Sequence, residues 1–276
     1  MIAGTGSEAR TTGVHPRADA TDAGLAALIF DVDGTLADTE RDGHRVAFNQ
    51  AFSEAGLDWH WDVPLYGALL AVTGGKERMR YYLDRYRQDF PRPADLDAQI
   101  ARLHAAKTRH YTALLAQGGI PLRPGVRRLL AEARAAGMRL AIATTTTPEN
   151  VTALLRCALT ADAESWFEVI AAGDVVPAKK PAPDIYQYAL EELGLEARAC
   201  LAFEDSENGL RAARDAGLRT VVTVNDYTRD QDFSDALLVL DQLGEAEQPF
   251  RVLASAMPLN GARAFDLALA RKLAAH

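Results

Sequence analysis

Two carboxylates follow an apolar segment near the start of the chain. Residues 25–30 (LAALIF) carry no charge and are typical of a buried strand in a parallel sheet. Asp31 and Asp33 come directly after this segment, and Gly34 and Thr35 then turn the chain. In open α/β sheets, ligands bind in the crevice at the carboxyl ends of the strands. The pattern therefore indicates a metal site, a nucleophile or an acid/base group, without choosing among them.

A calcium-binding loop is the structural alternative for this motif. Such a loop needs a third acidic residue before its glycine and a distal glutamate. Residues 31–40 (DVDGTLADTE) do not supply that spacing, so we favour a catalytic site.

Three further strand ends carry polar residues that buried strands do not need. Thr144 and Thr145 follow RLAIA, Lys180 lies in VPAKKPAPDIY, and Glu204 and Asp205 follow CLAF. Taken singly, these residues are explained as a strand-end hydroxyl, a solvated loop charge and acidic residues at a helix N-terminus. Their order at successive strand ends favours one shared crevice instead.

This set of side chains suits phosphoryl transfer. A phosphate repels an attacking carboxylate, and Mg²⁺ together with an ammonium group offsets that repulsion. An aspartate nucleophile forms an acyl phosphate and divides the reaction into two easier steps. A second carboxylate two residues further on is placed to protonate the leaving alkoxide and then to activate water.

Two kinds of element are expected to position these residues. Between residues 41 and 118, apolar residues recur at helical spacing without strand-like alternation, which predicts an all-helical segment inserted after the first strand. Beyond residue 121, helices are expected at 126–136, 150–159, 184–193 and 206–216, and strands at 139–143, 169–172, 199–203, 220–224 and 237–240. Such alternation predicts a doubly wound α/β fold, a parallel sheet with helices on both faces.

We expect the chain to divide into four regions. They are a disordered N-terminal extension (1–24), an α/β core (25–40 and 119–243), a helical cap (41–118) and a C-terminal extension (244–276). The amphipathic segment after residue 250 is expected either to pack on the core or to contact a partner.

Composition narrows the classes of function. The 276-residue chain has a net charge of −8, which argues against general affinity for nucleic acid. It contains no apolar run of about 18 residues, so we expect no membrane span. Its first residues lack the apolar core of a secretory signal. We expect a cytoplasmic monomer whose partner is a small molecule.

The four strand-end motifs resemble those of the haloacid dehalogenase superfamily, in the order of that family. They are DVDGT at 31–35, Thr144, Lys180 in KPAPDIY, and EDSENGL at 204–210. The resemblance implies that Asp31 is the nucleophile, that Asp33 is the general acid/base, and that Thr144 and Lys180 hold the phosphoryl group.

The same resemblance implies a Mg²⁺ cofactor. Its ligands would be Asp31, Asp205, the main-chain carbonyl of Asp33 and Glu204. Haloacid dehalogenases themselves lack the second aspartate, so Asp33 argues for a phosphate substrate and against a carbon–halogen bond.

The helical insertion resembles the cap of the β-phosphoglucomutase-like subfamily, and more closely that of the CbbY-type sugar phosphatases. The similar segments are DTE at 38–40, WHWD at 59–62, TGGKER at 73–78, AKTRHY at 106–111 and IATTTTPENV at 142–151. This resemblance implies hydrolysis of xylulose-1,5-bisphosphate, an inhibitor of Rubisco in the Calvin cycle, to xylulose 5-phosphate.

The TGGKER segment is expected to approach a phosphate. It is no nucleotide-binding P-loop, because Glu77 follows Lys76 and position 70 is Leu70. Its alternative is a glycine turn that leads into a charged helix. The substrate contacts expected on this reasoning are Gly75, Lys76, Arg78 and Lys107 for phosphate, and Glu40, His44, Tyr66 and Thr145 for the rest of the sugar phosphate.

Two other functions compete with the phosphatase. A phosphomutase would use the same Asp31 and Asp33 but return the phosphate to a second sugar hydroxyl. A non-catalytic phosphosugar sensor would keep the crevice without turnover.

His44 also has an alternative role, that of a proton carrier near Asp33.

Overall fold

The sheet is the element on which the rest of the protein is built. The computed structural model describes residues 24–118 and 120–276, so the expected disorder of the N-terminal extension lies outside the described residues, apart from Gly24. Its strands have the spatial order β3-β2-β1-β4-β5-β6-β7. Their bounds are β1 Ala27–Phe30, β2 Arg139–Thr144, β3 Val169–Ala172, β4 Cys200–Glu204, β5 Arg219–Thr223, β6 Leu238–Leu240 and β7 Val252–Ser255.

Strand β1 lies between the strands that carry the other motifs. Phe30 at its end is in register with Ile142 of β2 on one side and with Phe203 of β4 on the other, and both pairings are parallel. The chain order reverses direction across β1, which is the topological switch point at which ligands bind in such sheets. The predicted doubly wound parallel sheet is confirmed, and only β7 runs antiparallel among the described strands.

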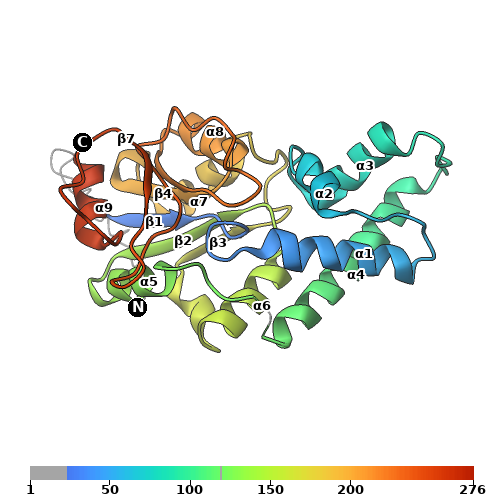
Figure 1. Ribbon diagram of the computed structural model, residues 1–276, viewed down its shortest axis with the longest axis horizontal. Helices are drawn as coiled ribbons and strands as arrows, with labels where there is room; N and C mark the ends of the chain where they lie inside the picture. Colours follow the sequence, from blue (N-terminus) through green and yellow to red (C-terminus); the bar gives the residue numbers. More distant parts are fainter. Residues whose placement is uncertain (1–23, 119) are drawn as a thin grey trace, which may run out of the picture.

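Helices cover both faces of the sheet (Figure 1). Alternate side chains of β1 explain this arrangement, because Leu28 and Phe30 join one apolar cluster while Ala27 and Ile29 join another. The helices on the two faces are α5 Val126–Ala135, α6 Pro148–Ala158 and α9 Leu267–Ala274 on the first, and α7 Asp184–Leu193 and α8 Glu207–Asp215 on the second. Two short 3₁₀ turns, Ala163–Trp166 and Ala197–Ala199, complete the connections.

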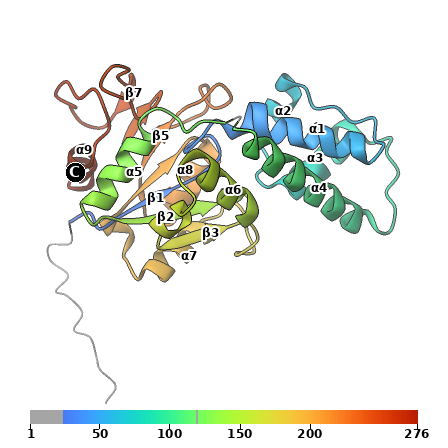
Figure 2. The same cartoon turned by 90° about the horizontal axis from the view of Figure 1, so that it is seen from below.

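The segment between β1 and β2 is helical, as predicted, and lies at one end of the sheet (Figure 2). A π-helical turn, η1 (Glu40–His44), leads into it, and this turn was not predicted. The helices that follow are α1 Arg45–Glu54, α2 Val63–Leu69, α3 Gly75–Tyr86 and α4 Leu96–Ala116. They enclose an apolar cluster of their own, rich in aromatic rings such as Phe52, Trp59 and Trp61.

The C-terminal segment packs on the α/β part of the protein, which resolves the alternative that the sequence left open. Strand β7 pairs with β6, and helix α9 joins the apolar cluster on one face of the sheet. Phe265 is fully buried with its ring edge-on to Phe203, at a centroid distance of 5.3 Å. Strand β7 was not predicted. All four of its residues are exposed, so its sequence lacks the pattern of buried apolar residues from which the other strands were predicted.

No helix in the described part of the chain is both long and apolar enough to cross a membrane. The domain boundaries, the monomeric state and the cytoplasmic location remain predictions.

Replacing Phe265 with alanine tests whether the C-terminal segment is part of the core. We expect the free energy of unfolding to fall by about 3–5 kcal/mol, because a fully buried ring leaves a cavity. The exposed Leu253 of β7 is the matched control, and Leu253→Ala should change stability by less than about 0.5 kcal/mol. Urea unfolding followed by circular dichroism measures both, and equal effects would contradict this packing.

Candidate active site

The carboxyl ends of β1, β2 and β4 open on one cavity of about 240 Å³. Residues 31, 205 and 144 reach it from these strand ends, and the helical segment closes it from the other side. The predicted residues that line it are Asp31, Asp33, Glu40, Arg78, Thr144, Thr145, Lys180 and Asp205. The structure therefore brings together the residues of the four motifs, although they are spread over most of the chain.

Lys180 joins two of the carboxylates. Its Nζ atom donates to Asp31 Oδ1 at 2.7 Å, to Glu204 Oε1 at 2.6 Å and to the carbonyl of Ala143 at 2.9 Å. The side chain is only 5% exposed. Burial opposes its charge, but the two carboxylates outweigh burial and raise the pKa of Lys180, so it remains an ammonium. A fixed positive charge beside Asp31 suits a phosphoryl group that arrives there.

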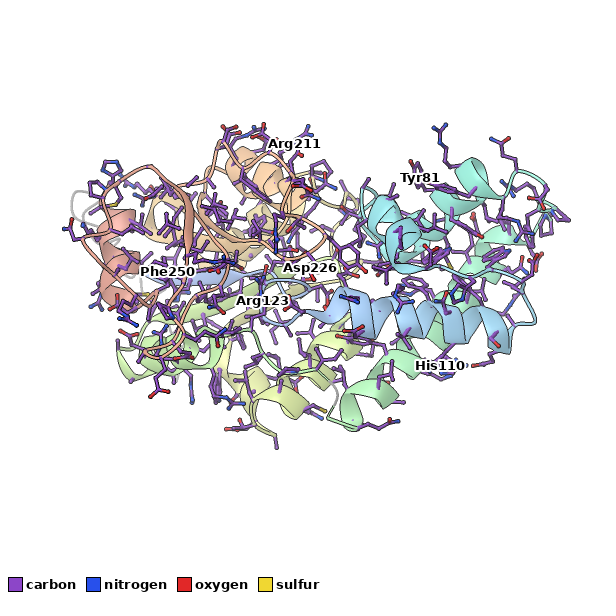
Figure 3. All side chains as sticks on the ribbon, viewed as in Figure 1. Tyr81, His110, Arg123, Arg211, Asp226 and Phe250 are labelled. Carbon is purple, nitrogen blue, oxygen red and sulfur yellow. The ribbon has the colours of Figure 1, made fainter. Side chains whose placement is uncertain are left out.

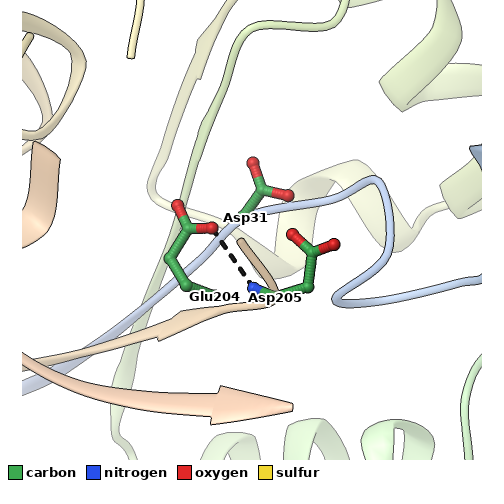
Figure 4. A group of neighbouring side chains, drawn as sticks. All are labelled: Asp31, Glu204 and Asp205. Carbon is green, nitrogen blue, oxygen red and sulfur yellow. Dashed lines mark hydrogen bonds between the residues drawn. The ribbon is translucent and has the colours of Figure 1, made fainter. Parts of the chain in front are cut away.

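Asp31, Glu204 and Asp205 form an acidic cluster whose oxygen atoms lie within 4.8 Å of one another (Figure 4). Burial, with Glu204 and Asp33 adding repulsion, raises the pKa of Asp31 to about 8 despite Lys180. Burial and repulsion from Asp31 and Glu204 also raise the pKa of Asp205 well above its usual value. Buried carboxylate oxygens with uncompensated negative charge are a donor set that fits a hard divalent cation such as Mg²⁺.

The donor atoms of this cluster are not equally free. Glu204 Oε1 accepts from Lys180 and from the Tyr186 hydroxyl at 2.5 Å, and Glu204 Oε2 accepts from the Asp205 amide at 3.3 Å. Asp31 has one carboxylate oxygen outside its bond to Lys180, and Asp205 has one outside its 2.7 Å bond from Asn225. Asp31 and Asp205 are thus the better placed direct ligands, while Glu204 holds Lys180.

Two glycines of the motifs make room for these carboxylates. Gly34 has a φ angle of +84°, and a Cβ atom there would lie 2.2 Å from Asp205 Oδ2. A Cβ atom at Gly209 would lie 1.9 Å from Glu204 Oε2. Neither position can carry a side chain without moving the acidic cluster, which explains the glycine in both DVDG and EDSENG.

Asp33 accepts hydrogen bonds that fix its orientation. The Thr39 hydroxyl lies 2.5 Å and His44 Nε2 lies 2.8 Å from the same atom, Asp33 Oδ1. Lys107 Nζ lies 2.8 Å from His44 Nδ1, and because an ammonium only donates, the ring proton must sit on Nε2 and point to Asp33. Burial alone would raise the pKa of Asp33, but His44 and Thr39 outweigh it and lower that pKa.

These contacts show where the side chains of His44 and Lys107 lie relative to the cavity. His44 lies on Asp33, which was its alternative role, and neither residue lines the cavity. Lys107 was expected to hold phosphate, but it contacts His44 and lies over the rings of Phe48 and Tyr111. Burial lowers the pKa of Lys107 to about 8.

Arg78 faces the cavity from the helical segment. Its Nη1 donates to the Tyr66 hydroxyl at 3.1 Å, and that hydroxyl in turn donates to the Glu40 carboxylate. The Nε atom of Arg78 is buried and has no hydrogen-bond partner among residues 24–118 and 120–276. Buried arginine donors are costly to leave unpaired, so this guanidinium is poised for an anion.

Gly75 and Lys76 do not line the cavity, contrary to the role expected for them. Gly75 starts α3 and packs against His104 and Phe48, which leaves no room for a side chain. Lys76 Nζ pairs with Asp174 Oδ2 at 2.5 Å, across the boundary between the helical segment and the sheet. Here the alternative, a glycine turn leading into a charged helix, describes the structure better.

Several residues at the site were missed by the sequence analysis. Asn208 of α8 donates to the Ala71 carbonyl and to Thr73 Oγ1, each at 3.2 Å, and so forms a second contact across the same boundary. Asp174 could have been noticed because it follows the short strand β3, as the motif residues follow theirs. Thr39 and Asn225 were not singled out, because nothing in their residue types shows that they donate to Asp33 and Asp205.

Comparison with known proteins identifies the class. A family model described as haloacid dehalogenase-like hydrolase matches residues 25–217. The chain belongs to this family, and it is a phosphoric monoester hydrolase.

Within the family, the chain is similar to proteins named CbbY. It is 55% identical over 225 residues to the plasmid-encoded protein CbbY of Cupriavidus necator, which covers 82% of this chain and 88% of that protein. The crystal structure of CbbY from Rhodobacter sphaeroides in complex with phosphate has a TM-score of 0.74 and 50% identity, and it covers 79% of this chain and 94% of that one. A variant of the same Rhodobacter protein, crystallised in complex with xylulose-(1,5)bisphosphate, matches with the same values.

Replacing Asp31 with asparagine tests the nucleophile. Asparagine keeps an oxygen for Lys180 but cannot attack phosphorus, so we expect kcat to fall at least about 1,000-fold. Inorganic phosphate released from p-nitrophenyl phosphate measures it. The control Asp226→Asn alters an exposed aspartate and should leave kcat unchanged. Full turnover by Asp31→Asn would reject the assignment.

A double-mutant cycle separates the two roles of Lys76. If Lys76 only pairs with Asp174, then Lys76→Met and Asp174→Asn should each raise KM by at most about fivefold, because exposed ion pairs contribute about 0.2–1 kcal/mol. The double variant should be no worse than the single ones. A larger effect of Lys76→Met that adds to that of Asp174→Asn would instead indicate contact with substrate.

Proposed function

We propose that this protein hydrolyses the 1-phosphate of xylulose-1,5-bisphosphate to give xylulose 5-phosphate, with Mg²⁺ as its cofactor. The observation that carries this proposal is a cavity lined by cationic side chains from two parts of the chain. Lys180 and Thr144 lie beside Asp31 on the sheet, and the unpaired guanidinium donor of Arg78 comes from the helical segment. A bisphosphate presents one phosphate to each. The CbbY variant crystallised with this sugar bisphosphate supports the choice.

In the first step, one carboxylate oxygen of Asp31 attacks the phosphorus, while the other remains available to the metal. The bond between phosphorus and the sugar oxygen breaks, and an aspartyl phosphate forms on Asp31. The Thr144 hydroxyl donates to a phosphoryl oxygen, and the fixed positive charge of Lys180 beside Asp31 offsets the charge of the phosphoryl group. Bound Mg²⁺, held by Asp31 and Asp205 with the Asp33 carbonyl, would supply further neutralisation of the phosphate.

Asp33 moves the proton. Both of its hydrogen-bond donors, Thr39 and His44, contact Oδ1, so Oδ2 is the oxygen available to the substrate. Since His44 and Thr39 keep Asp33 deprotonated before substrate binds, the proton that Asp33 passes to the departing sugar oxygen in the first step must enter with the phosphate monoanion of the substrate. In the second step Asp33 takes a proton from the water that attacks the aspartyl phosphate, which releases inorganic phosphate and restores Asp31.

Arg78 selects for the second phosphate. A guanidinium binds phosphate through two parallel hydrogen bonds, which a lysine cannot reproduce. Glu40, Tyr66 and Thr145 are proposed to meet the sugar between the two phosphates, and Glu40 and Thr145 line the same cavity.

Assays with the purified protein test this function. We expect one inorganic phosphate per xylulose-1,5-bisphosphate, loss of turnover with a chelator and recovery with Mg²⁺. Arg78→Met should raise KM for the bisphosphate at least about 10-fold while leaving p-nitrophenyl phosphate hydrolysis within about twofold, because only the bisphosphate needs the second site. Preference for sugar monophosphates would contradict the proposal, and an isomerised sugar phosphate without phosphate release would indicate a mutase.

A further inference from the structure

Arg123 lies where the chain returns from the helical segment to the sheet (Figure 3). Its amide donates to the Leu36 carbonyl at 2.9 Å, next to a backbone bridge between Ala37 and Leu122. Its side chain is only 7% exposed. The sequence gives no reason to single out this arginine, which stands in a PLRPG loop.

All three nitrogen atoms of the Arg123 guanidinium are used. Nη1 donates to the carbonyl of Gly34 and to that of Thr223, the latter at 2.9 Å. Nη2 donates to the carbonyls of Val224 at 2.6 Å and Asp241 at 2.8 Å. Nε lies 3.4 Å from Asp38 Oδ1. A buried guanidinium is stable only with such partners, so its position is tightly defined.

Two of these carbonyls belong to segments that carry the reaction. Gly34 directly follows Asp33, and it packs so closely on Asp205 that a Cβ atom would lie 2.2 Å from Oδ2. Val224 directly precedes Asn225, which donates to Asp205 at 2.7 Å. Arg123 therefore binds the loop of Asp33 and the segment that holds Asp205 through neighbouring nitrogens of one planar group.

We propose that Arg123 is a positioning residue. It fixes the position of Asp33 relative to Asp31 and Asp205, and it links these residues to Asp38 at the start of the helical segment. The inference rests on the proposed roles of Asp31 and Asp33, and it does not depend on which sugar carries the phosphate. Arginine is required because its fork presents donors in several directions, whereas a lysine has a single nitrogen.

Arg128 of α5 offers a comparison close to Arg123 in the chain. It also binds backbone carbonyls, those of Gly244 at 2.8 Å and Phe265 at 3.2 Å, but these belong to the C-terminal segment and not to the site. Loss of Arg128 removes hydrogen bonds to the backbone without touching the loop of Asp33.

The first test compares Arg123→Lys with Arg128→Lys, using p-nitrophenyl phosphate. A displacement of about 1 Å in a catalytic group costs about 100-fold in rate, so Arg123→Lys should lower kcat by about that factor and change KM by less than about threefold. Arg128→Lys should lower the melting temperature to a similar degree and keep kcat within about twofold. Unchanged kcat in folded Arg123→Lys, or an equal loss of kcat in Arg128→Lys, would overturn the proposal.

The second test is chemical rescue. Arg123 lines a second cavity of about 570 Å³, distinct from that of the candidate active site. A small ion can therefore reach the space that Arg123→Ala would leave. Guanidinium chloride at millimolar concentration should restore kcat at least about 10-fold, and equal sodium chloride or urea should not, because only guanidinium reproduces the planar donors. A folded Arg123→Ala that is not rescued would overturn the proposal, and the lysine variant decides if the alanine variant does not fold.

These assays separate the two proposals. Wild-type protein that hydrolyses p-nitrophenyl phosphate but not xylulose-1,5-bisphosphate would reject the proposed substrate and leave the role of Arg123 to be judged on its own assay.

Discussion

The site depends on the attraction between one buried ammonium, that of Lys180, and the carboxylates of Asp31 and Glu204. A single positive charge cannot neutralise the three acidic side chains that the strand ends bring together. Because these side chains are buried, water stabilises their negative charge less than it would at the surface. Burial, together with the remaining negative charge, raises the pKa values of Asp31 and Asp205. A divalent cation would compensate this excess of negative charge. The arrangement that is electrostatically costly without a metal is therefore suited to bind one.

The two halves of the cavity differ in how they are supported. The three carboxylates of the acidic cluster lie at the ends of adjacent strands in fixed register, and Gly34 and Gly209 pack closely on two of them. Asp33, by contrast, takes its hydrogen bonds from Thr39 and from His44 of η1, and His44 is oriented by Lys107 of α4. The acid/base group is therefore fully oriented only when the helical segment lies against the sheet, as it does in this structure.

Much of the fold and the sheet side of the site could be predicted from sequence. Apolar strands end sharply at polar residues, and parallel strands bring those ends together, so the sequence predicts Asp31, Thr144 and Asp205 at one site. Lys180 was also expected at a strand end, but it reaches the cavity from the loop between β3 and α7. The helical side was harder, because the direction of a side chain there depends on how helices pack. Arg78 lines the cavity, as predicted. Lys76 instead pairs with Asp174, and Lys107 contacts His44. The role of Arg123 could not be predicted from the sequence, because its partners are backbone carbonyls, which any sequence provides.

The two donors on Asp33 Oδ1 have a consequence for the order of events. They leave one oxygen of Asp33 to serve both steps, so the departing sugar and the attacking water must use the same place in turn. Water cannot occupy that place while the sugar oxygen is there. Under the proposed mechanism, the aspartyl phosphate would therefore outlive the sugar product at the site, and inorganic phosphate would be the last product to leave. The two hydrogen bonds on Asp33 Oδ1 would thus set the order of product release.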